Sequence, residues 1–151
     1  MAVNLFEVLK KDHDEQRELT KKFKEEKSSS KWKNLFQEIR KELLPHVEGE
    51  EASFFQRLKD SEDKEIRLET LEKLEEHEVM EHLLKEAQDM DQSSEEFWAK
   101  VKVMLEINEH HIDEEEQETF KVMRKQFSED ELDSFLNKFN QEKEKVKKEI
   151  G

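Results

Sequence analysis

Apolar residues recur at helical spacing along most of this chain of 151 residues, and few residues would interrupt a helix. The periodic segments cover residues 4–27, 31–59, 62–90 and 94–127. Only two glycines and one proline are present, so the chain has little of the turn chemistry that β-hairpins need. Glu, Lys, Leu, Gln and Arg, which favour helices, supply much of the composition. The sequence therefore predicts an all-α protein.

The breaks between these segments carry signals for the start of a helix. Residues 28–30 are all serine and form a polar break before the second segment. Ser93 and Ser128 are each followed three residues later by a glutamate, which is typical of the capping box at a helix N-terminus. Pro45 lies inside the second segment, where it removes a backbone donor, and we expect it to kink that helix.

The chain length predicts a single domain. Short connections force neighbouring helices to run antiparallel, so we expect an up-down-up-down four-helix bundle over residues 1–127. After Ser128, apolar residues on one face predict a short additional amphipathic helix, and we expect the charged end of the chain to fray. Residues 128–151 would then pack on, or extend from, the same domain.

The composition excludes several classes of partner and site. The formal net charge of −14 repels phosphate backbones, and no basic stripe interrupted by aromatic residues is present, so we expect no nucleic-acid partner. The lack of cysteine excludes disulfides and metal–thiolate sites and fits a reducing compartment. The sequence contains no secretory signal and no run of eighteen apolar residues, so we expect a cytoplasmic protein without membrane contact.

The two halves of the chain repeat each other at a shift of 64 or 65 residues. An acid followed by a histidine occurs at His13 and again at His77. The stretch HVEGEEASFF, which starts at His46, matches HIDEEEQETF, which starts at His111, with histidine, two glutamates and phenylalanine in register. The repeat predicts two copies of a helix pair related by a pseudo-two-fold axis.

The helical phase of the apolar residues indicates which polar side chains face the core. In the fourth segment, Glu115 lies on the apolar face and His111 at its edge, whereas His110 points roughly 180° away from it. In the second segment, His46 and Glu50 both lie on the apolar face, whereas the neighbouring glutamates 48 and 51 point outward. The two inward pairs have the same spacing of four residues.

The first and third segments give the same result. His13 in the first segment faces inward, as do His77 and Glu81 in the third, whereas His82 points outward. Every helix of the predicted bundle therefore carries an inward histidine. One such histidine would suggest a hydrogen-bonded core residue, but four of them together with buried carboxylates require compensation of their charge.

A metal ion is the simplest compensation, since histidine nitrogens and carboxylates suit iron, manganese or zinc. The candidate ligands are His13, His46, Glu50, His77, Glu81, His111 and Glu115. A carboxylate from each half could bridge two ions. Phe55 and Phe120 follow the two inward glutamates of the repeat by five residues, a position consistent with a wall against water and with ordinary core packing.

Together these residues resemble the hemerythrin-like (HHE cation-binding) family, in particular through LLPHVEGEE, LEEHEVMEHLL and HHIDEEEQETF. The resemblance covers nearly the whole chain up to Phe127. It implies a non-haem di-iron centre bridged by carboxylates and by an oxo or hydroxo group. It also implies that the four inward histidines are terminal ligands and that Glu50 and Glu115 are the bridging carboxylates. Manganese or zinc remain alternatives for the metal.

Two positions depart from the oxygen-carrying members of that family. Where those proteins have a second histidine on the third helix, this chain has Glu81, and where they have an aspartate after the last ligand histidine, it has Glu116. We expect Glu81 either to complete the coordination of a metal or to hydrogen-bond a ligand histidine. The departures count against reversible oxygen transport.

Three functions follow as hypotheses. The first is a di-iron protein that binds or reacts with a small diatomic molecule or peroxide (O2, NO or H2O2) in sensing, detoxification or oxygen handling, with oxidoreductase reactivity left open. The second is an iron-storage or iron-sensing domain without turnover, in which metal occupancy controls folding or partner binding. The third is an interaction bundle with purely structural histidines.

Overall fold

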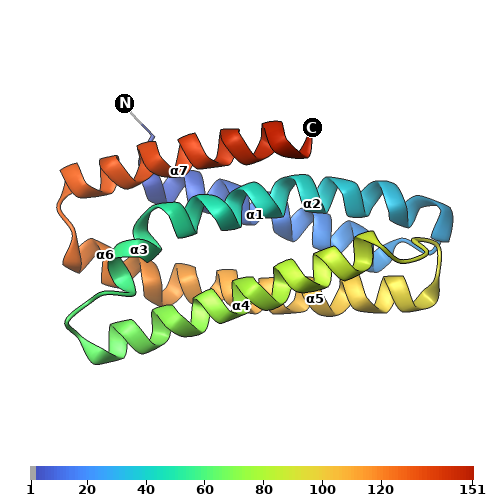
Figure 1. Cartoon of the computed structure of the whole chain (residues 1–151), viewed down its shortest axis with the longest axis horizontal. Helices are drawn as coiled ribbons and strands as arrows, with labels where there is room; N and C mark the ends of the chain where they lie inside the picture. The colour runs from blue at the N-terminus through green and yellow to red at the C-terminus, as the bar shows by residue number, and fades with distance from the viewer. Residues whose placement is uncertain (1–2) are drawn as a thin grey trace.

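The computed structural model describes residues 3–151, and long helices dominate it (Figure 1). The helices are α1 (Leu5–Glu25), α2 (Ser29–Ala52), α3 (Phe54–Leu58), α4 (Lys64–Gln88), α5 (Glu95–Glu114), α6 (Phe120–Gln126) and α7 (Glu129–Ile150). A π-helical turn, η1 (Glu115–Thr119), joins α5 to α6. Residues 3–151 contain no strand, so the predicted all-α class is confirmed.

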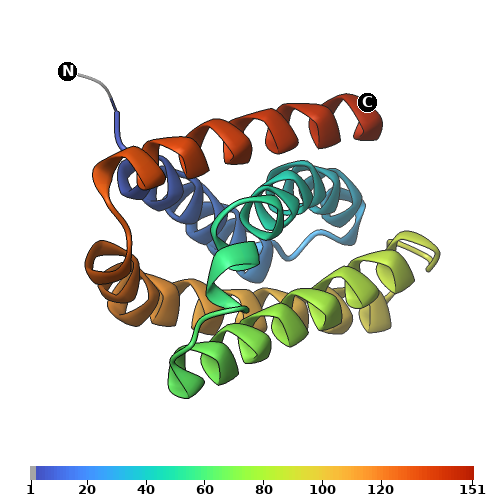
Figure 2. The same cartoon turned by 60° about the vertical axis from the view of Figure 1, so that its left-hand side comes forward.

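The long helices lie alongside one another, and α7 crosses the top of the assembly (Figures 1 and 2). Helix α1 contacts α2 and α5, and α4 contacts the same two helices, so each of these four helices has two neighbours among the others. Helix α7 lies along α2, which is its principal contact. The end of the chain therefore returns to the helix that carries one of the two repeated His-Glu motifs.

The second segment is not one continuous helix. Helix α2 continues through Pro45, which is buried, because packing against the rest of the protein holds the helix together across the missing donor. The break comes at Ser53, whose backbone angles (φ −114°, ψ −105°) are not helical. The short helix α3 follows it directly.

Two expectations about helix ends were wrong. The residue that caps α5 is Ser94 and not Ser93: its side-chain oxygen accepts a hydrogen bond from the backbone N–H of Phe97 at 3.1 Å. The predicted capping box at Ser128 is confirmed, but α7, predicted to be short with a frayed tail, is 22 residues long. It stays helical because its apolar face, including Phe135 and Phe139, is buried against the bundle.

Two apolar clusters fill the interior, and a band of buried polar residues separates them. One cluster includes Phe36, Met80 and Leu105, and the other includes Leu9 and Phe139. Along α1, along α4, along the run from α2 to α3 and along the run from α5 to α6, the buried histidine lies between residues that belong to different clusters. The inward histidines therefore meet in one layer across the bundle.

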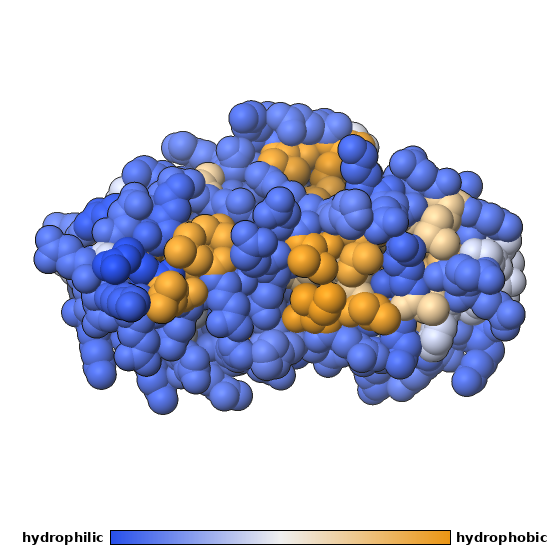
Figure 3. Space-filling model, turned by 60° about the horizontal axis from the view of Figure 1, so that its bottom comes forward, coloured by the Kyte–Doolittle hydropathy of each residue, from blue (hydrophilic) through white to orange (hydrophobic). Residues whose placement is uncertain are grey.

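The outer surface is mainly hydrophilic, with separate apolar patches on the face that includes α4 and α5 (Figure 3). On α4 and α5, the large apolar side chains that are 46% to 55% exposed are Leu68, Leu71, Val79 and Val103. Within residues 3–151, no helix combines the length and the apolar character needed to cross a membrane. Hydrophilic surface separates the patches, so they do not form a continuous apolar belt on this face.

The close approach of α7 to α2 at Gly49 can be tested by adding one methyl group. A Cβ atom at Gly49 would lie 2.7 Å from Cδ2 of Phe139 and 3.1 Å from its backbone oxygen. Phe139 is fully buried, so its ring has no free space to move into. Overpacking costs roughly 1–3 kcal/mol, and the upper part of this range, about 2–3 kcal/mol, applies here because a backbone oxygen as well as a buried ring would have to move. The better helix propensity of alanine offsets about 1 kcal/mol of this cost.

We therefore expect Gly49→Ala to lower the free energy of unfolding by roughly 1–2 kcal/mol, measured by urea denaturation followed by far-UV circular dichroism. Lys33→Ala is the control, because Lys33 is an exposed residue of the same helix. It should change the free energy of unfolding by less than about 0.5 kcal/mol. If Gly49→Ala were as stable as the wild type, α7 would not pack on α2 at this distance.

Candidate metal centre

Six polar side chains meet in the layer between the two apolar clusters. They are His13 of α1, His46 and Glu50 of α2, His77 of α4, His111 of α5 and Glu115 at the start of η1. Each is at most 2% exposed. The inward orientation that helical phase predicts for these residues is confirmed, and the structure brings together side chains from all four long helices.

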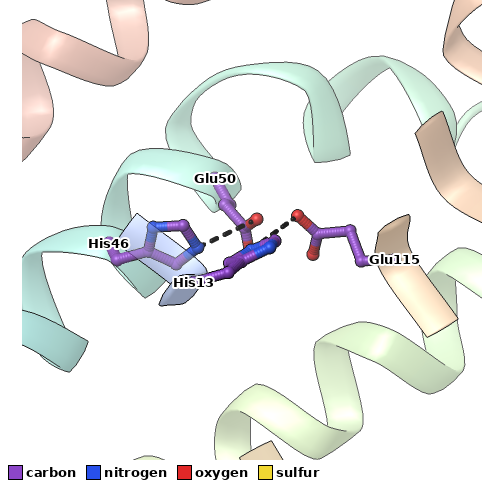
Figure 4. A group of neighbouring side chains, drawn as sticks. All are labelled: His13, His46, Glu50 and Glu115. Carbon is purple, nitrogen blue, oxygen red and sulfur yellow. Dashed lines mark ion pairs between the residues drawn. The ribbon is translucent and has the colours of Figure 1, made fainter. Parts of the chain in front are cut away.

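The first group of facing atoms involves α1, α2 and η1. His46 Nε2 lies 3.2 Å from Glu50 Oε2, and His13 Nε2 lies 3.4 Å from Glu115 Oε1. Figure 4 shows the four side chains pointing toward one another, His13 from α1, His46 and Glu50 from α2, and Glu115 from the start of η1. One ligand atom from each lies within 4.8 Å of those of the other three, a spacing that permits all four to bind a single cation.

The second group uses the other oxygen of each glutamate. His77 Nε2 lies 3.2 Å from Glu50 Oε1, and His111 Nε2 lies 3.4 Å from Glu115 Oε2. The two imidazole Nε2 atoms lie 2.9 Å apart. Each glutamate therefore presents one oxygen to each group, which is the arrangement of a carboxylate that bridges two cations.

A carboxylate also contacts the other ring nitrogen, Nδ1, of each histidine. The pairs are His13–Glu116 at 2.7 Å, His46–Asp12 at 2.9 Å, His77–Glu51 at 3.0 Å and His111–Glu76 at 2.9 Å. We call these four acids the outer carboxylates. An Nδ1–H that donates to a carboxylate leaves the Nε2 lone pair of a neutral imidazole directed into the centre, as in known metal-binding histidines.

Several of these buried atoms have no hydrogen-bond partner among residues 3–151. They are Nε2 of His13 and His46 and both carboxylate oxygens of Glu50 and Glu115. Buried polar atoms are normally paired, because leaving them unpaired costs free energy. Four imidazole nitrogens and four carboxylate oxygens form a donor set that suits iron, manganese or zinc. The residues therefore fit a site for two metal ions.

Neighbouring carboxylates raise the pKa values of the histidines in the metal-free protein. Burial disfavours the charged form of His46, but the Glu50 and Asp12 carboxylates outweigh burial and raise its pKa to about 10. The pKa values of His13, His77 and His111 are also raised, since facing carboxylates outweigh burial there too. Burial would raise the pKa of Glu50, but the nearby histidines hold it well below its usual value.

Phenylalanines from both halves of the repeat contact the histidines. The ring of Phe55 packs edge-on against His77 at a centroid distance of 5.4 Å, and the ring of Phe120 stacks on His13 at 6.2 Å. Both phenylalanines are at most 4% exposed. Their contacts support a wall against water as well as core packing.

Each of these phenylalanines follows an irregular turn of the helix. Five residues along a straight α-helix correspond to a rotation of about 140°, so a regular helix would not direct Glu50 and Phe55 to the same layer. The break at Ser53 lies between them. In the second half, η1 starts at Glu115 and ends just before Phe120, and π-helical turns of this kind are frequent at functional sites.

Sequence reasoning missed the outer carboxylates, although the repeat carried a signal for them. Asp12 and Glu76 each directly precede a candidate ligand histidine. Glu51 and Glu116 each directly follow an inward glutamate. The same shift of 64 or 65 residues relates the members of each pair. Helical phase placed Glu51 on the outer face, and its side chain is indeed 34% exposed, yet its carboxylate reaches His77 on the neighbouring helix.

Three of the outer carboxylates are also paired with a basic side chain. The pairs are Lys143 with Asp12, Lys73 with Glu76 and Arg17 with Glu116. The fourth, Glu51, instead lies in a group of carboxylates with Glu48 and Glu81. Glu51 is therefore the outer carboxylate that has no lysine or arginine partner among these contacts.

Glu81, a predicted candidate ligand, lies outside both groups that face the centre. It is partly buried beside Glu48, and burial together with that carboxylate raises its pKa to about 8. Glu81 lies near Glu51, and the carboxylate of Glu51 contacts Nδ1 of the candidate ligand His77.

Comparisons with known proteins identify the family of this chain. A model of the "Hemerythrin HHE cation binding domain" family matches residues 4–123. A curated protein from Nostoc sp. (strain PCC 7120 / SAG 25.82 / UTEX 2576) that is named "DNA nickase" is 24% identical over 149 residues, which make up 99% of this chain and 42% of that protein. No solved structure matches the chain. Since the family match covers all six side chains of the centre, this chain belongs to the hemerythrin HHE cation-binding domain family.

Proposed function

We propose that this protein is a non-haem di-iron protein that binds or reacts with a small diatomic molecule or peroxide (O2, NO or H2O2) in sensing, detoxification or oxygen handling. The observation that carries the proposal is the pair of donor groups that share both carboxylates. His13 and His46 would hold one iron ion, His77 and His111 would hold the other, and Glu50 and Glu115 would contact both.

In this proposal α1, α2, α4 and the run from α5 to α6 are the helices of an up-down-up-down hemerythrin-like bundle over residues 1–127, with α7 as an addition. The contacts among these helices support it, because each has two of the others as neighbours. Ligands from four helices then converge on one layer, so the position of each ligand depends on the packing of the whole bundle.

Two iron ions would supply a redox-active pair with room for a small external ligand. The contribution of the chain is to orient the imidazoles through the outer carboxylates and to exclude water with the two apolar clusters and with Phe55 and Phe120. The His77 corner offers the best approach from solvent, because Glu51 and Phe55 line a surface pocket of 390 Å³ there. Passage through protein packing favours small molecules over larger substrates.

An iron-storage or iron-sensing domain without turnover is the alternative. The unpaired buried atoms of the centre favour it, because metal binding would remove an energetic penalty of the folded state and so couple occupancy to folding. The name of the Nostoc relative does not lead us to propose an action on DNA. The chain spans 42% of that protein, and its net charge of −14 opposes contact with phosphate backbones.

Metal analysis combined with an anaerobic titration tests the proposed function. We expect protein purified with iron to hold two iron ions per chain. After anaerobic reduction, addition of O2, NO or peroxide should produce a new visible band or rapid consumption of the added molecule. Iron that binds but shows no response to any of the three would favour storage or sensing. Well under one transition-metal ion per chain would contradict both metal functions.

Neighbouring histidines provide a matched pair of variants. His111→Ala removes a side chain that is 2% exposed and faces both glutamates, whereas His110→Ala removes one that is 64% exposed. We expect His111→Ala to reduce the iron content and the thermal stabilisation that iron gives, which is about 2.7 kcal/mol at a ligand concentration one hundred times Kd. His110→Ala should retain the iron and change the unfolding free energy by less than about 0.5 kcal/mol. Equal effects of the two would refute the inward orientation of His111.

Metal binding should also release protons. The pKa of His46 in the metal-free protein is about 10, so this side chain is protonated at pH 7 and must lose a proton to offer Nε2 to a metal. We expect at least one proton released per chain at pH 7 and an apparent Fe²⁺ affinity that rises between pH 6 and pH 8. Anaerobic calorimetry in two buffers of different ionisation enthalpy measures the number of protons. An affinity that fell with pH over this range would contradict the protonation of the centre.

A further inference from the structure

Helix α7 contacts the candidate metal centre through a buried chain of polar contacts. Lys143 Nζ lies 2.7 Å and 2.8 Å from the two carboxylate oxygens of Asp12, and one of these oxygens lies 2.9 Å from Nδ1 of His46. The side chains of Lys143 and Asp12 are only 15% and 5% exposed. A single carboxylate therefore separates the ammonium group of α7 from a candidate ligand.

The internal repeat indicates why a residue of α7 is needed at this place. In the second half of the chain, Glu76 holds His111, and Lys73 of the same helix lies 3.5 Å from Glu76. The residue 64 positions before Lys73 is Leu9, which is apolar and fully buried. The first half therefore has no basic residue at the equivalent position, and Lys143 supplies the ammonium group from α7.

Helix α7 also packs against the candidate ligand His46. The ring of Phe139 meets that of His46 edge-on at a centroid distance of 5.5 Å, and Phe139 is fully buried. Gly49, next to the bridging candidate Glu50, provides the space for this ring. Helix α7 lies beyond residues 4–123, so these contacts come from outside the part of the chain that the family model covers.

We propose that α7 is an integral part of the metal centre, with Lys143 as a positioning residue for the metal position formed by His13 and His46. Lys143 holds the Asp12 carboxylate against Nδ1 of His46, and this contact fixes the orientation of the imidazole and of its Nε2 lone pair. The docking of α7 and the occupancy of this position then stabilise each other, because the two equilibria share these contacts. The inference rests on the proposed two-metal site and assigns α7 to one of its two positions.

Variants that retain one metal position each can test the assignment. His77→Ala leaves the His13–His46 position, and His13→Ala leaves the His77–His111 position. Loss of the partner that orients a ligand histidine lowers metal affinity by roughly 10- to 100-fold. We therefore expect Lys143→Met to weaken Fe²⁺ binding at least about tenfold in the His77→Ala background and less than about threefold in the His13→Ala background. Anaerobic competition with a chromogenic chelator measures both affinities.

Lys145→Met is the matched control, since this lysine is on the same helix and its side chain is 67% exposed. It should leave both affinities unchanged, and Lys143→Arg, which keeps the charge, should restore most of the lost affinity. Lys143→Gln serves as a second variant if Lys143→Met folds poorly, with far-UV circular dichroism as the check on folding. Equal losses in the two backgrounds, or no loss in either, would overturn the assignment.

Hydrogen exchange gives a second readout that does not depend on the single-position variants. In the wild type, Fe²⁺ binding should slow amide exchange in residues 135–146, and Lys143→Met should abolish this protection. If neither single-position variant holds iron, the wild type decides the question. Amide exchange in these residues that does not change when iron binds to the wild type would overturn this inference but not the proposed function. A wild-type chain that retained no iron would instead overturn the proposed function.

Discussion

The structure depends on the burial of four imidazoles and two carboxylates that face one another in a layer shielded from bulk solvent. Such a layer is unfavourable unless positive charge balances the carboxylates, as metal ions or as protons. The pKa of His46, raised to about 10 against the opposing effect of burial by the carboxylates of Glu50 and Asp12, gives the layer one such proton at pH 7 when no metal is bound. The apolar clusters on either side give the layer its low dielectric constant and so strengthen every interaction within it.

Charge alternates outward from this layer. Each histidine is bound through Nδ1 to an outer carboxylate, and three of these carboxylates contact a lysine or arginine. Such alternation keeps each buried charge beside an opposite one, which is the condition under which buried ions are tolerated. The contacts also extend the centre to parts of the chain remote from the ligands: Lys143 is separated from Asp12 by 131 residues. A final helix that would otherwise be a peripheral addition thus shares in the electrostatics of the site.

Helical periodicity was sufficient to predict the all-α class and the inward orientation of His13, His46, His77 and His111, because each of these properties depends on local phase. The break at Ser53, the π-helical turn η1 and the length of α7 were not predictable in the same way. All three depend on contacts between segments far apart in sequence, which hold irregular or charged stretches in place. The outer carboxylates were predictable in part. They recur at equivalent positions of the repeat, but the helical phase of α2 alone directs Glu51 outward, although its carboxylate contacts His77.

The internal symmetry ends where the chain departs from the oxygen-carrying members of its family. Arg17 follows His13 by four residues and contacts Glu116, whereas the residue that follows His77 by four is Glu81, which lies beside Glu51. Equivalent positions of the repeat thus carry a charged guanidinium in one half and, in the other, a carboxyl group whose pKa is raised to about 8 by burial and by the carboxylate of Glu48. A guanidinium near His13 disfavours additional positive charge there, and carboxylates near His77 favour it. The two proposed metal positions are therefore electrostatically unequal, and Glu81 lies on the side of His77, beside the outer carboxylate Glu51.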